Sequence, residues 1–249
     1  LILLTILGTL LLISSYDLIA MYLAIELQSF CSYILTSLKR NSEYSAEAGL
    51  KYFILGAFSS GFLLFGCSLI YGFTGTTNYK QLSVLLASND YDFINTNGIV
   101  VGSIFILVAF LFKLSAAPFH LWSPDIYEGS LTSSTIFFAV VPKISLFIIL
   151  IRLFQCSFYG FLDNWRYCFV LIAVLSIIIG SFAGLEQRKI KSLLAYSSIS
   201  HMGYSLLAFS TGTLEGIQVL FNYLIIYMLS GVCIWIIFLS LRLKSRILC

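Results

Sequence analysis

The sequence predicts an all-α membrane protein with about eight transmembrane helices. Hydrophobic residues make up 59% of the chain and charged residues only 10%, whereas roughly 25% of the residues in a soluble domain are charged. Apolar runs long enough to cross a bilayer as helices recur along the chain. We therefore expect a single multi-pass domain over residues 1–249, embedded in a lipid bilayer.

The apolar runs define eight predicted spans, separated by short stretches of turn-forming residues. The spans cover residues 1–15, 16–38, 47–71, 98–122, 131–154, 167–185, 191–210 and 214–241. Serine, glycine, aspartate and asparagine gather in the joins, as is typical of turns. The connection over 72–97 is longer and contains a predicted short surface helix over 79–87.

Lysine and arginine are distributed unevenly between the two sets of loops. Eight fall on one side of the predicted bundle and three on the other. The larger set is Lys39, Arg40, Arg188, Lys189, Lys191, Arg242, Lys244 and Arg246, and the smaller set is Lys80, Arg152 and Arg166. Because basic loops stay on the cytoplasmic or matrix side of a membrane, we expect the larger set to lie on that side.

Two lysines lie inside predicted spans. Lys113 falls in the run 98–122, and Lys143 falls near the middle of the run 131–154. A cation at the centre of a membrane helix costs roughly 2.5–3.5 kcal/mol on insertion scales, so an intramembrane lysine indicates a functional site. The alternative is a lysine whose long side chain reaches the membrane surface, which suits Lys113 better than Lys143.

Four further ionisable residues are candidates for the same site. Glu26 lies centrally in the second span, as either a relay carboxylate or a neutral, hydrogen-bonded structural residue. Lys51 begins the third span, where it either reaches the surface or joins the relay. His120, which follows Pro118, and His201 in the seventh span are either structural or proton carriers. An unperturbed histidine, with a pKa of about 6.5, suits proton transfer.

Pro118 and Pro142 predict broken helices, because each lies within an apolar span and removes a backbone hydrogen bond. Inside a membrane such a break is tolerated only where other groups or water satisfy the freed carbonyls. The two ends of a broken helix also carry opposite partial charges at mid-depth, where ion transporters place their sites.

A glutamate and two lysines on neighbouring spans can move protons. Burial disfavours a charged lysine and a nearby carboxylate favours it, so separating the two makes the lysine release its proton. A relay of these three residues needs neither a metal nor a bound cofactor. The six cysteines also show no spacing typical of a metal site. A net charge of +3 with no basic run among aromatic residues also argues against nucleic acid.

Four segments carry a family resemblance. They are AIELQSF (24–30), EAGLKYFILGAFSSGFLLFG (47–66), FKLSAAPFHLWSPDIYEGS (112–130) and KSLLAYSSISHMGY (191–204). Together they resemble the antiporter-like membrane subunits of respiratory complex I, the NADH:ubiquinone oxidoreductase. TGTLEGIQ at 211–218 is similar to the mitochondrial rather than the plastid form. The resemblance runs through nearly the whole chain and is weakest over 76–97 and near the carboxyl end.

The resemblance implies a fourteen-helix, antiporter-like fold of two inverted repeats, each with one broken helix. This chain would correspond to about helices four to eleven, so the architecture is expected to be incomplete. Either the sequence is partial, or a separate chain supplies the missing helices and the outer lysine of the twelfth. The resemblance implies a proton relay through Glu26, Lys113 and Lys143, with His120 and Lys51 as further members.

The resemblance also implies a function and a setting. The chain would be a proton-translocating subunit driven at a distance by quinone reduction, beside other membrane-arm subunits in the mitochondrial inner membrane. NADH, FMN, iron–sulfur clusters and ubiquinone are expected to bind to partner subunits. We expect no redox centre and no metal in this chain. Two alternatives remain: a stand-alone cation/proton antiporter, which co-purification with a redox complex would distinguish, and a structural subunit with an inert site.

Overall fold

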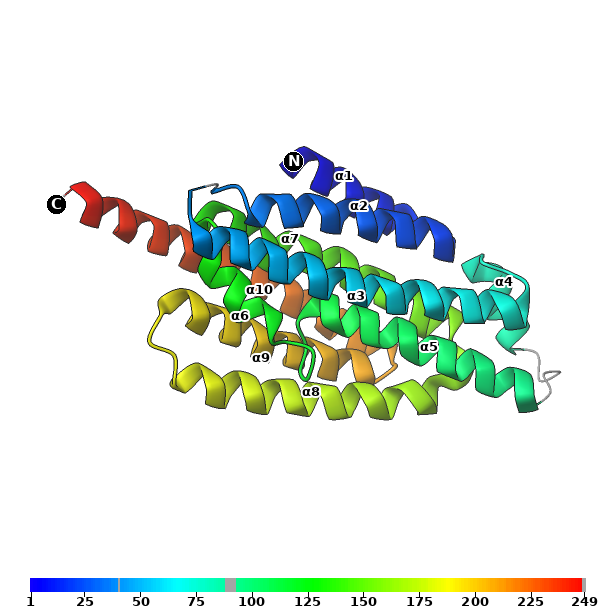
Figure 1. Ribbon diagram of the computed structural model, residues 1–249. Helices are drawn as coiled ribbons and strands as arrows, with labels where there is room; N and C mark the ends of the chain where they lie inside the picture. Colours follow the sequence, from blue (N-terminus) through cyan, green and yellow to red (C-terminus); the bar gives the residue numbers. More distant parts are fainter. Residues whose placement is uncertain (40, 88–92, 248–249) are drawn as a thin grey trace.

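The computed structural model describes residues 1–39, 41–87 and 93–247, and within these ranges the chain forms helices and no strand. The long helices lie roughly side by side in one bundle (Figure 1). The elements are α1 (Ile2–Ser14), α2 (Leu18–Thr36), α3 (Glu43–Thr74), α4 (Tyr79–Ala87), α5 (Phe93–Leu114), α6 (Trp122–Gly129), α7 (Thr132–Leu150), the π-helix η1 (Ile151–Ser157), the 3-10 helix η2 (Tyr159–Phe161), α8 (Leu162–Leu185), α9 (Ile190–Ser210) and α10 (Leu214–Ile247).

The predicted all-α membrane class is confirmed. Six helices in the described part of the chain are long and apolar enough to cross a membrane, namely α2, α3, α5, α7 with η1, α8 and α10. The other two predicted spans are α1, a shorter apolar helix, and α9, whose 21 residues include several serines. The predicted surface helix over 79–87 is α4.

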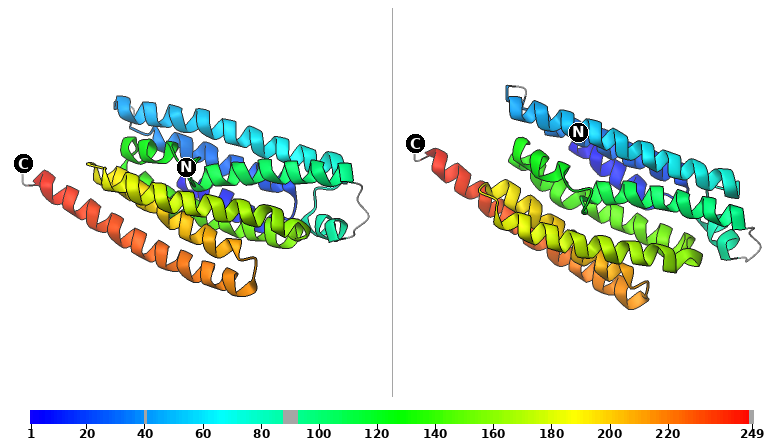
Figure 2. Two further views of the ribbon diagram at one scale, coloured as in Figure 1. Left: turned by 90° about the horizontal axis from the view of Figure 1, so that it is seen from below. Right: turned by 60° about the horizontal axis from the view of Figure 1, so that its bottom comes forward.

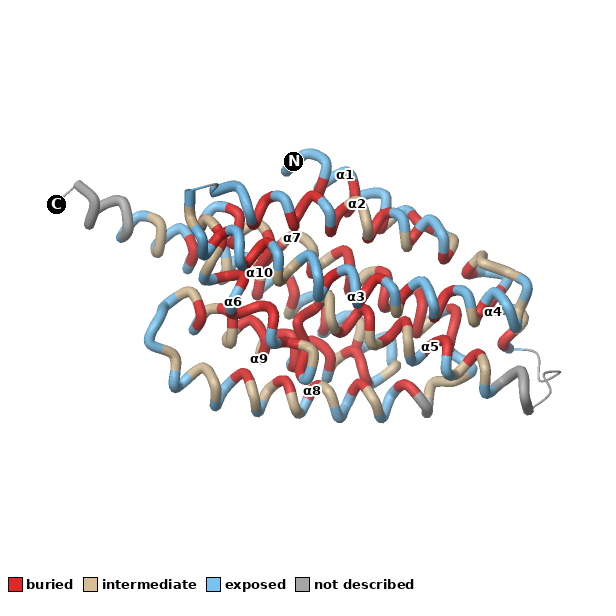
Figure 3. The backbone as a smooth tube through the Cα atoms, in the orientation of Figure 1, coloured by how far each residue is buried: buried red, intermediate tan, exposed pale blue. Residues whose placement is uncertain are grey.

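The core of the bundle lies around α7, which contacts α1, α2, α5 and α10. Phe147 and Leu150 of α7 are fully buried there, as are Phe110 of α5 and Leu220 of α10. Figure 2 shows α3 and α10 at opposite edges of the bundle. Figure 3 shows exposed positions along the outer helices and buried ones toward the centre. An apolar exterior is the surface that a bilayer requires.

Glycine allows two pairs of helices to pack backbone against backbone. A Cβ atom at Gly66 of α3 would lie 2.8 Å from the carbonyl oxygen of Gly102 on α5. A Cβ atom at Gly203 of α9 would lie 2.9 Å from the carbonyl oxygen of Ala173 on α8. Small residues at such contacts are a main source of helix association in membranes, where lipid removes the hydrophobic driving force.

The helix break predicted near Pro118 is confirmed. α5 ends at Leu114 and α6 begins at Trp122. Two backbone groups at the break have side-chain partners, as the membrane interior requires. The amide of Ala117 donates to Ser176 Oγ of α8 at 3.0 Å, and Trp122 Nε1 donates to the carbonyl oxygen of Phe112 at 2.9 Å.

The break predicted near Pro142 is wrong, because α7 continues through this residue from Thr132 to Leu150. A proline removes only its own backbone donor, and the neighbouring turns can keep theirs. Close packing on several sides holds α7 in helical form across this residue. The irregularity lies further along, in the π-helix Ile151–Ser157.

Arg152 in this π-helix fixes the end of α1. Its Nη1 donates to the carbonyl oxygens of Ile13 at 2.8 Å and Ser15 at 2.7 Å. The guanidinium also lies 4.9 Å from the centre of the Tyr16 ring. These carbonyls lack partners within α1, so the arginine both caps the helix and ties it to α7.

The glycine contact between α3 and α5 leads to a stability prediction. Gly66→Ala should lower the free energy of unfolding by about 1–3 kcal/mol, because the new methyl group meets backbone that cannot move aside. Gly61→Ala in the same helix is the matched control, since a Cβ atom there meets nothing within 4 Å. It should be neutral or stabilise by up to about 1 kcal/mol. Thermal unfolding in detergent measures both, and equal effects would contradict the packing described.

Candidate functional site

Lys113 lies in the last turn of α5, immediately before the helix break. The carboxyl end of a helix carries a partial negative charge, which stabilises a nearby cation. Its Nζ donates to the hydroxyl of Tyr33 on α2 at 3.3 Å, and it lies 5.8 Å from the centre of that ring. A buried hydroxyl and a helix end thus take the place of a direct ion pair.

Tyr33 has its place because α3 carries a glycine opposite it. A Cβ atom at Gly56 would overlap the Tyr33 hydroxyl, so only glycine leaves room for the ring at this depth. Tyr33 itself is 6% exposed. It lies seven residues, or about two helical turns, after Glu26, so the two share one face of α2.

Glu26 is half-buried on that face, and its Oε1 is buried without a hydrogen-bond partner among the described residues. It is close enough to Lys113 for Coulombic attraction. No ion pair or hydrogen bond within the described ranges joins the two directly. Gln28 Oε1, on a different face of α2 that packs against Gly8 of α1, is likewise buried with no hydrogen-bond partner among the described residues. Glu26 and Lys113 therefore interact through Coulombic attraction without a direct contact.

Lys143 is 4% exposed, in the middle of α7. Its Nζ donates to the hydroxyl of Tyr227 on α10 at 3.1 Å and lies 5.3 Å from the centre of that ring. The Tyr227 hydroxyl in turn donates to the carbonyl oxygen of Ala139, one turn before Lys143, at 3.1 Å. The lysine, the tyrosine and the helix backbone form one hydrogen-bonded unit.

A second polar group adjoins this unit from α9. The His201 ring lies 5.3 Å from the Tyr227 ring, and its Nδ1 is 2.7 Å from the Tyr223 hydroxyl. A cavity of about 40 Å³ lies beside them, lined in part by Ser197 and Ser198. One water needs about 10–15 Å³ of such volume, so this cavity has room for two or three.

Two further tyrosines lie near the tyrosine partners of the lysines. Tyr52 of α3 packs edge-on against Tyr33, with ring centres 4.7 Å apart. Tyr127 of α6 is buried and within electrostatic range of both Tyr52 and Tyr227. We call Tyr33, Tyr52, Tyr127 and Tyr227 the tyrosine row. Tyr33 bonds to Lys113 and Tyr227 bonds to Lys143, but no hydrogen bond within the described ranges joins one member of the row to the next. Hydroxyl groups can both donate and accept protons.

His120 lies in the turn between α5 and α6 and is 7% exposed. Its Nδ1 is buried with no partner in the described part of the chain. Its ring faces Tyr196 of α9 at 6.4 Å. No hydrogen bond or ion pair between described residues joins it to Lys113 or Lys143, so its relay role stays a prediction.

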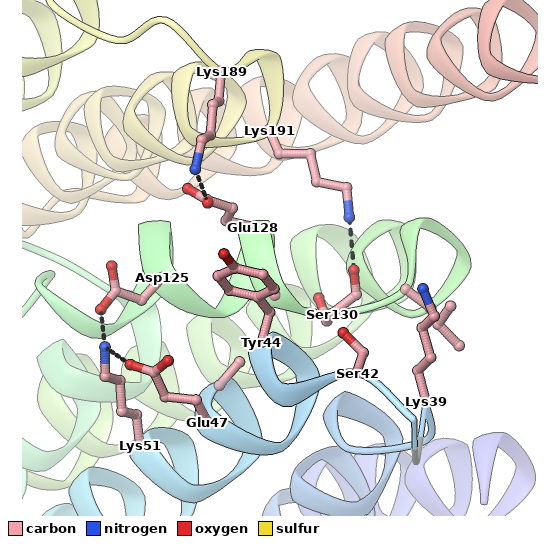
Figure 4. A pocket seen from close by; sticks show the side chains of 13 residues that line it. Lys39, Ser42, Tyr44, Glu47, Lys51, Asp125, Glu128, Ser130, Lys189 and Lys191 are labelled. Atoms are coloured by element: carbon pink, nitrogen blue, oxygen red, sulfur yellow. Dashed lines mark hydrogen bonds and ion pairs between the residues drawn. The ribbon is translucent and has the colours of Figure 1, made fainter. Parts of the chain in front are cut away.

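Lys51 lies at a different place, in the wall of a surface pocket of about 580 Å³ (Figure 4). Its Nζ is 2.9 Å from Glu47 Oε1 and 2.9 Å from Asp125 Oδ2. Asp125 belongs to α6, so Lys51 ties the segment after the break to α3. This contact indicates a positioning role, and no contact among the described residues connects Lys51 to Lys113.

Sequence reasoning did not single out the tyrosine row. The seven-residue spacing of Glu26 and Tyr33, and the four-residue spacing of Tyr223 and Tyr227, were available signals because each places two polar groups on one helix face. Sequence spacing could not show which tyrosine pairs with each lysine, because the partners lie 80 and 84 residues apart.

A family model described as NADH:quinone oxidoreductase/Mrp antiporter, TM, matches residues 15–247. The chain is 53% identical over 244 residues to NADH-ubiquinone oxidoreductase chain 2 of Marchantia polymorpha, covering 97% of this chain and 50% of that protein. It is 45% identical to NADH-quinone oxidoreductase subunit N of Pelagibacter ubique, covering 97% of this chain and 50% of that protein. The chain thus spans about half the length of these curated relatives.

A solved structure shows the same fold. The structure of respiratory complex I from Thermus thermophilus with bound aureothin contains a chain with a TM-score of 0.74 and 34% sequence identity. The match covers 92% of this chain and 49% of that one. Since the family model also extends over nearly all of the sequence, this chain belongs to the NADH:quinone oxidoreductase/Mrp antiporter transmembrane family.

Proposed function

We propose that this chain is a proton-translocating membrane subunit of NADH:ubiquinone oxidoreductase. Protons move along Glu26, Lys113 and Lys143, and the movement is coupled at a distance to quinone reduction. The observation that supports this most is the pair of lysines inside the bundle, each held by a tyrosine hydroxyl. The relatives named NADH-ubiquinone oxidoreductase chain 2 support the choice of complex.

The relay works through the charge balance at Lys113. Glu26 attracts the ammonium form of Lys113 without a direct bond, so a small movement of the carboxylate changes how firmly the proton is held. A proton released from Lys113 passes to the oxygen of the Tyr33 hydroxyl as that hydroxyl gives up its own proton to a bridging water, and water joins the later members of the tyrosine row in the same way. Transfer needs each donor and acceptor in hydrogen-bond reach or joined by one water.

Lys143 receives the proton at the far end of the row. It has Tyr227 as its polar partner and the small cavity next to it, from which water completes the path to His201. The aromatic ring and the hydroxyl of Tyr227 both stabilise the ammonium form of Lys143. A cation over a buried aromatic ring gains about 2 kcal/mol or more, which offsets part of the desolvation.

The setting follows from the same proposal. The chain lies in the mitochondrial inner membrane among other membrane-arm subunits, and NADH, FMN, iron–sulfur clusters and ubiquinone bind to partner subunits. The alternative is a cation/proton antiporter that works without a redox complex, which the antiporter half of the family description favours. Purification under mild detergent separates the two: co-purification with NADH:ubiquinone reductase activity supports the first, and isolation without it supports the second.

The two lysines Lys113 and Lys51 make a matched pair for testing the relay. Lys113→Met should slow quinone-linked proton translocation at least roughly tenfold, because a proton carrier is lost. Lys51→Met should change it by less than about twofold, since an exposed ion pair contributes little. Proton uptake by vesicles, normalised to assembled subunit, measures both. Equal losses would overturn the different roles assigned to them.

Tyr227 tests whether the hydroxyls of the tyrosine row carry protons. Tyr227→Phe keeps the ring over Lys143 but removes the hydroxyl, so translocation should fall roughly five- to tenfold while the subunit still assembles. Tyr167→Phe on α8 is the control, since Tyr167 is 75% exposed. Translocation by Tyr227→Phe at the rate of this control would mean that the hydroxyl is not part of the path.

A further inference from the structure

The pocket that contains Lys51 has a second half that the proton relay does not use. It lies at the end of the bundle where the loops α2–α3, α6–α7 and α8–α9 meet. In the view of Figure 4, Lys39, Ser42, Ser130 and Lys191 lie on one side of the pocket, away from Lys51. We call these four residues the serine–lysine group.

The carboxylates of the pocket are already engaged elsewhere. Glu47 and Asp125 both contact Lys51, and Glu128 of α6 pairs with Lys189. Glu128 also raises the pKa of Lys189 above its usual value through their hydrogen bond. The three carboxylates that line the pocket thus have Lys51 and Lys189 as their ion-pair partners.

Three helices begin at this pocket. Ser42, Leu131 and Lys189 precede the first residues of α3, α7 and α9, and all three line it. None of them makes a side-chain capping hydrogen bond. Backbone amides at a helix start lack partners within the helix and carry the positive end of its dipole. Three such ends around one pocket favour a bound anion.

Ser130 supplies an independent indication of a ligand. It is 3% exposed, lines the pocket, and its hydroxyl has no hydrogen-bond partner among the described residues. Leaving a buried hydroxyl unsatisfied costs about 1–3 kcal/mol. Its carbonyl oxygen accepts a hydrogen bond from Lys191 Nζ at 2.6 Å, which holds the ammonium beside it. Lys39 is exposed, lines the pocket and makes no side-chain hydrogen bond or ion pair with the described residues.

We propose that the serine–lysine group binds a phosphate group. A tetrahedral phosphate offers several acceptor oxygens to the two ammonium groups, the two hydroxyls and the nearby helix amides. The pocket volume of about 580 Å³ is larger than one phosphate and leaves room for the rest of a phosphate ester. The phosphate belongs either to an anionic lipid of the leaflet on the basic side or to a soluble phosphate ester.

The test uses the full-length protein with the subunits that co-purify with it, held in phosphatidylcholine nanodiscs. Two probes are titrated separately: phosphatidylglycerol incorporated into the discs, and inorganic phosphate in solution. Binding is followed by native mass spectrometry for the lipid and by the shift in thermal unfolding for both probes. None of these readouts depends on proton pumping, so failure here and failure of the proposed function are distinguishable.

Lys39→Gln should weaken binding of the recognised probe roughly fivefold, since one lysine near the phosphate is lost. Ser130→Ala should weaken it roughly tenfold, yet without probe this variant should be at least as stable as the native protein. A merely structural serine would instead lower stability in both conditions. Lys80→Gln removes one lysine in α4, at the opposite end of the bundle, and is the matched control.

The outcomes separate the two sources of phosphate. Loss of phosphatidylglycerol binding alone in the two variants assigns the site to a lipid headgroup. Loss of inorganic phosphate binding assigns it to a soluble phosphate. If Lys39→Gln and Ser130→Ala bind both probes as Lys80→Gln does, the pocket is not a phosphate site.

Discussion

The presence of two lysines inside the helix bundle, Lys143 buried and Lys113 half-buried, is the constraint on which the rest of the structure depends. An unpaired cation in hydrocarbon is expensive, and neither lysine has a carboxylate within ion-pair distance in the described part of the chain. The bundle instead gives each one a tyrosine from another helix. The glycine opposite Tyr33 and the carbonyl that fixes Tyr227 can be understood as supports for those two contacts.

The segment after the helix break is held from two sides. α6 is eight residues long, too short to be stable alone. Lys51 of α3 binds Asp125, and Lys189 and Ser192 at the start of α9 bind Glu128. These exposed contacts are individually weak. Together they fix the position of Tyr127, which lies between the two carboxylates in sequence and belongs to the tyrosine row.

The charged groups of this protein lie in two regions that differ in how strongly solvent screens their interactions. The interior of the bundle contains only a few charges, and they interact strongly because little solvent screens them. Such charges suit a relay that responds to small movements. At the end of the bundle that contains the surface pocket, many charged side chains are exposed to solvent and lie around the first residues of α3, α7 and α9. A ligand bound there would lie at the carboxyl end of α6, in the same pocket as the ion pairs that hold this helix.

The sequence by itself determined the membrane class, six of the spans, the surface helix 79–87, the break near Pro118 and the presence of charged residues inside the bundle, because hydropathy and proline act locally. The break near Pro142 was not predictable, since packing around α7 decides whether a proline interrupts it. The partners of the two lysines were also decided by tertiary structure. Lys113 and Tyr33 are 80 residues apart, and Lys143 and Tyr227 are 84 apart. Only the arrangement of α2, α5, α7 and α10 brings these side chains within hydrogen-bond reach, and no local pattern records that arrangement.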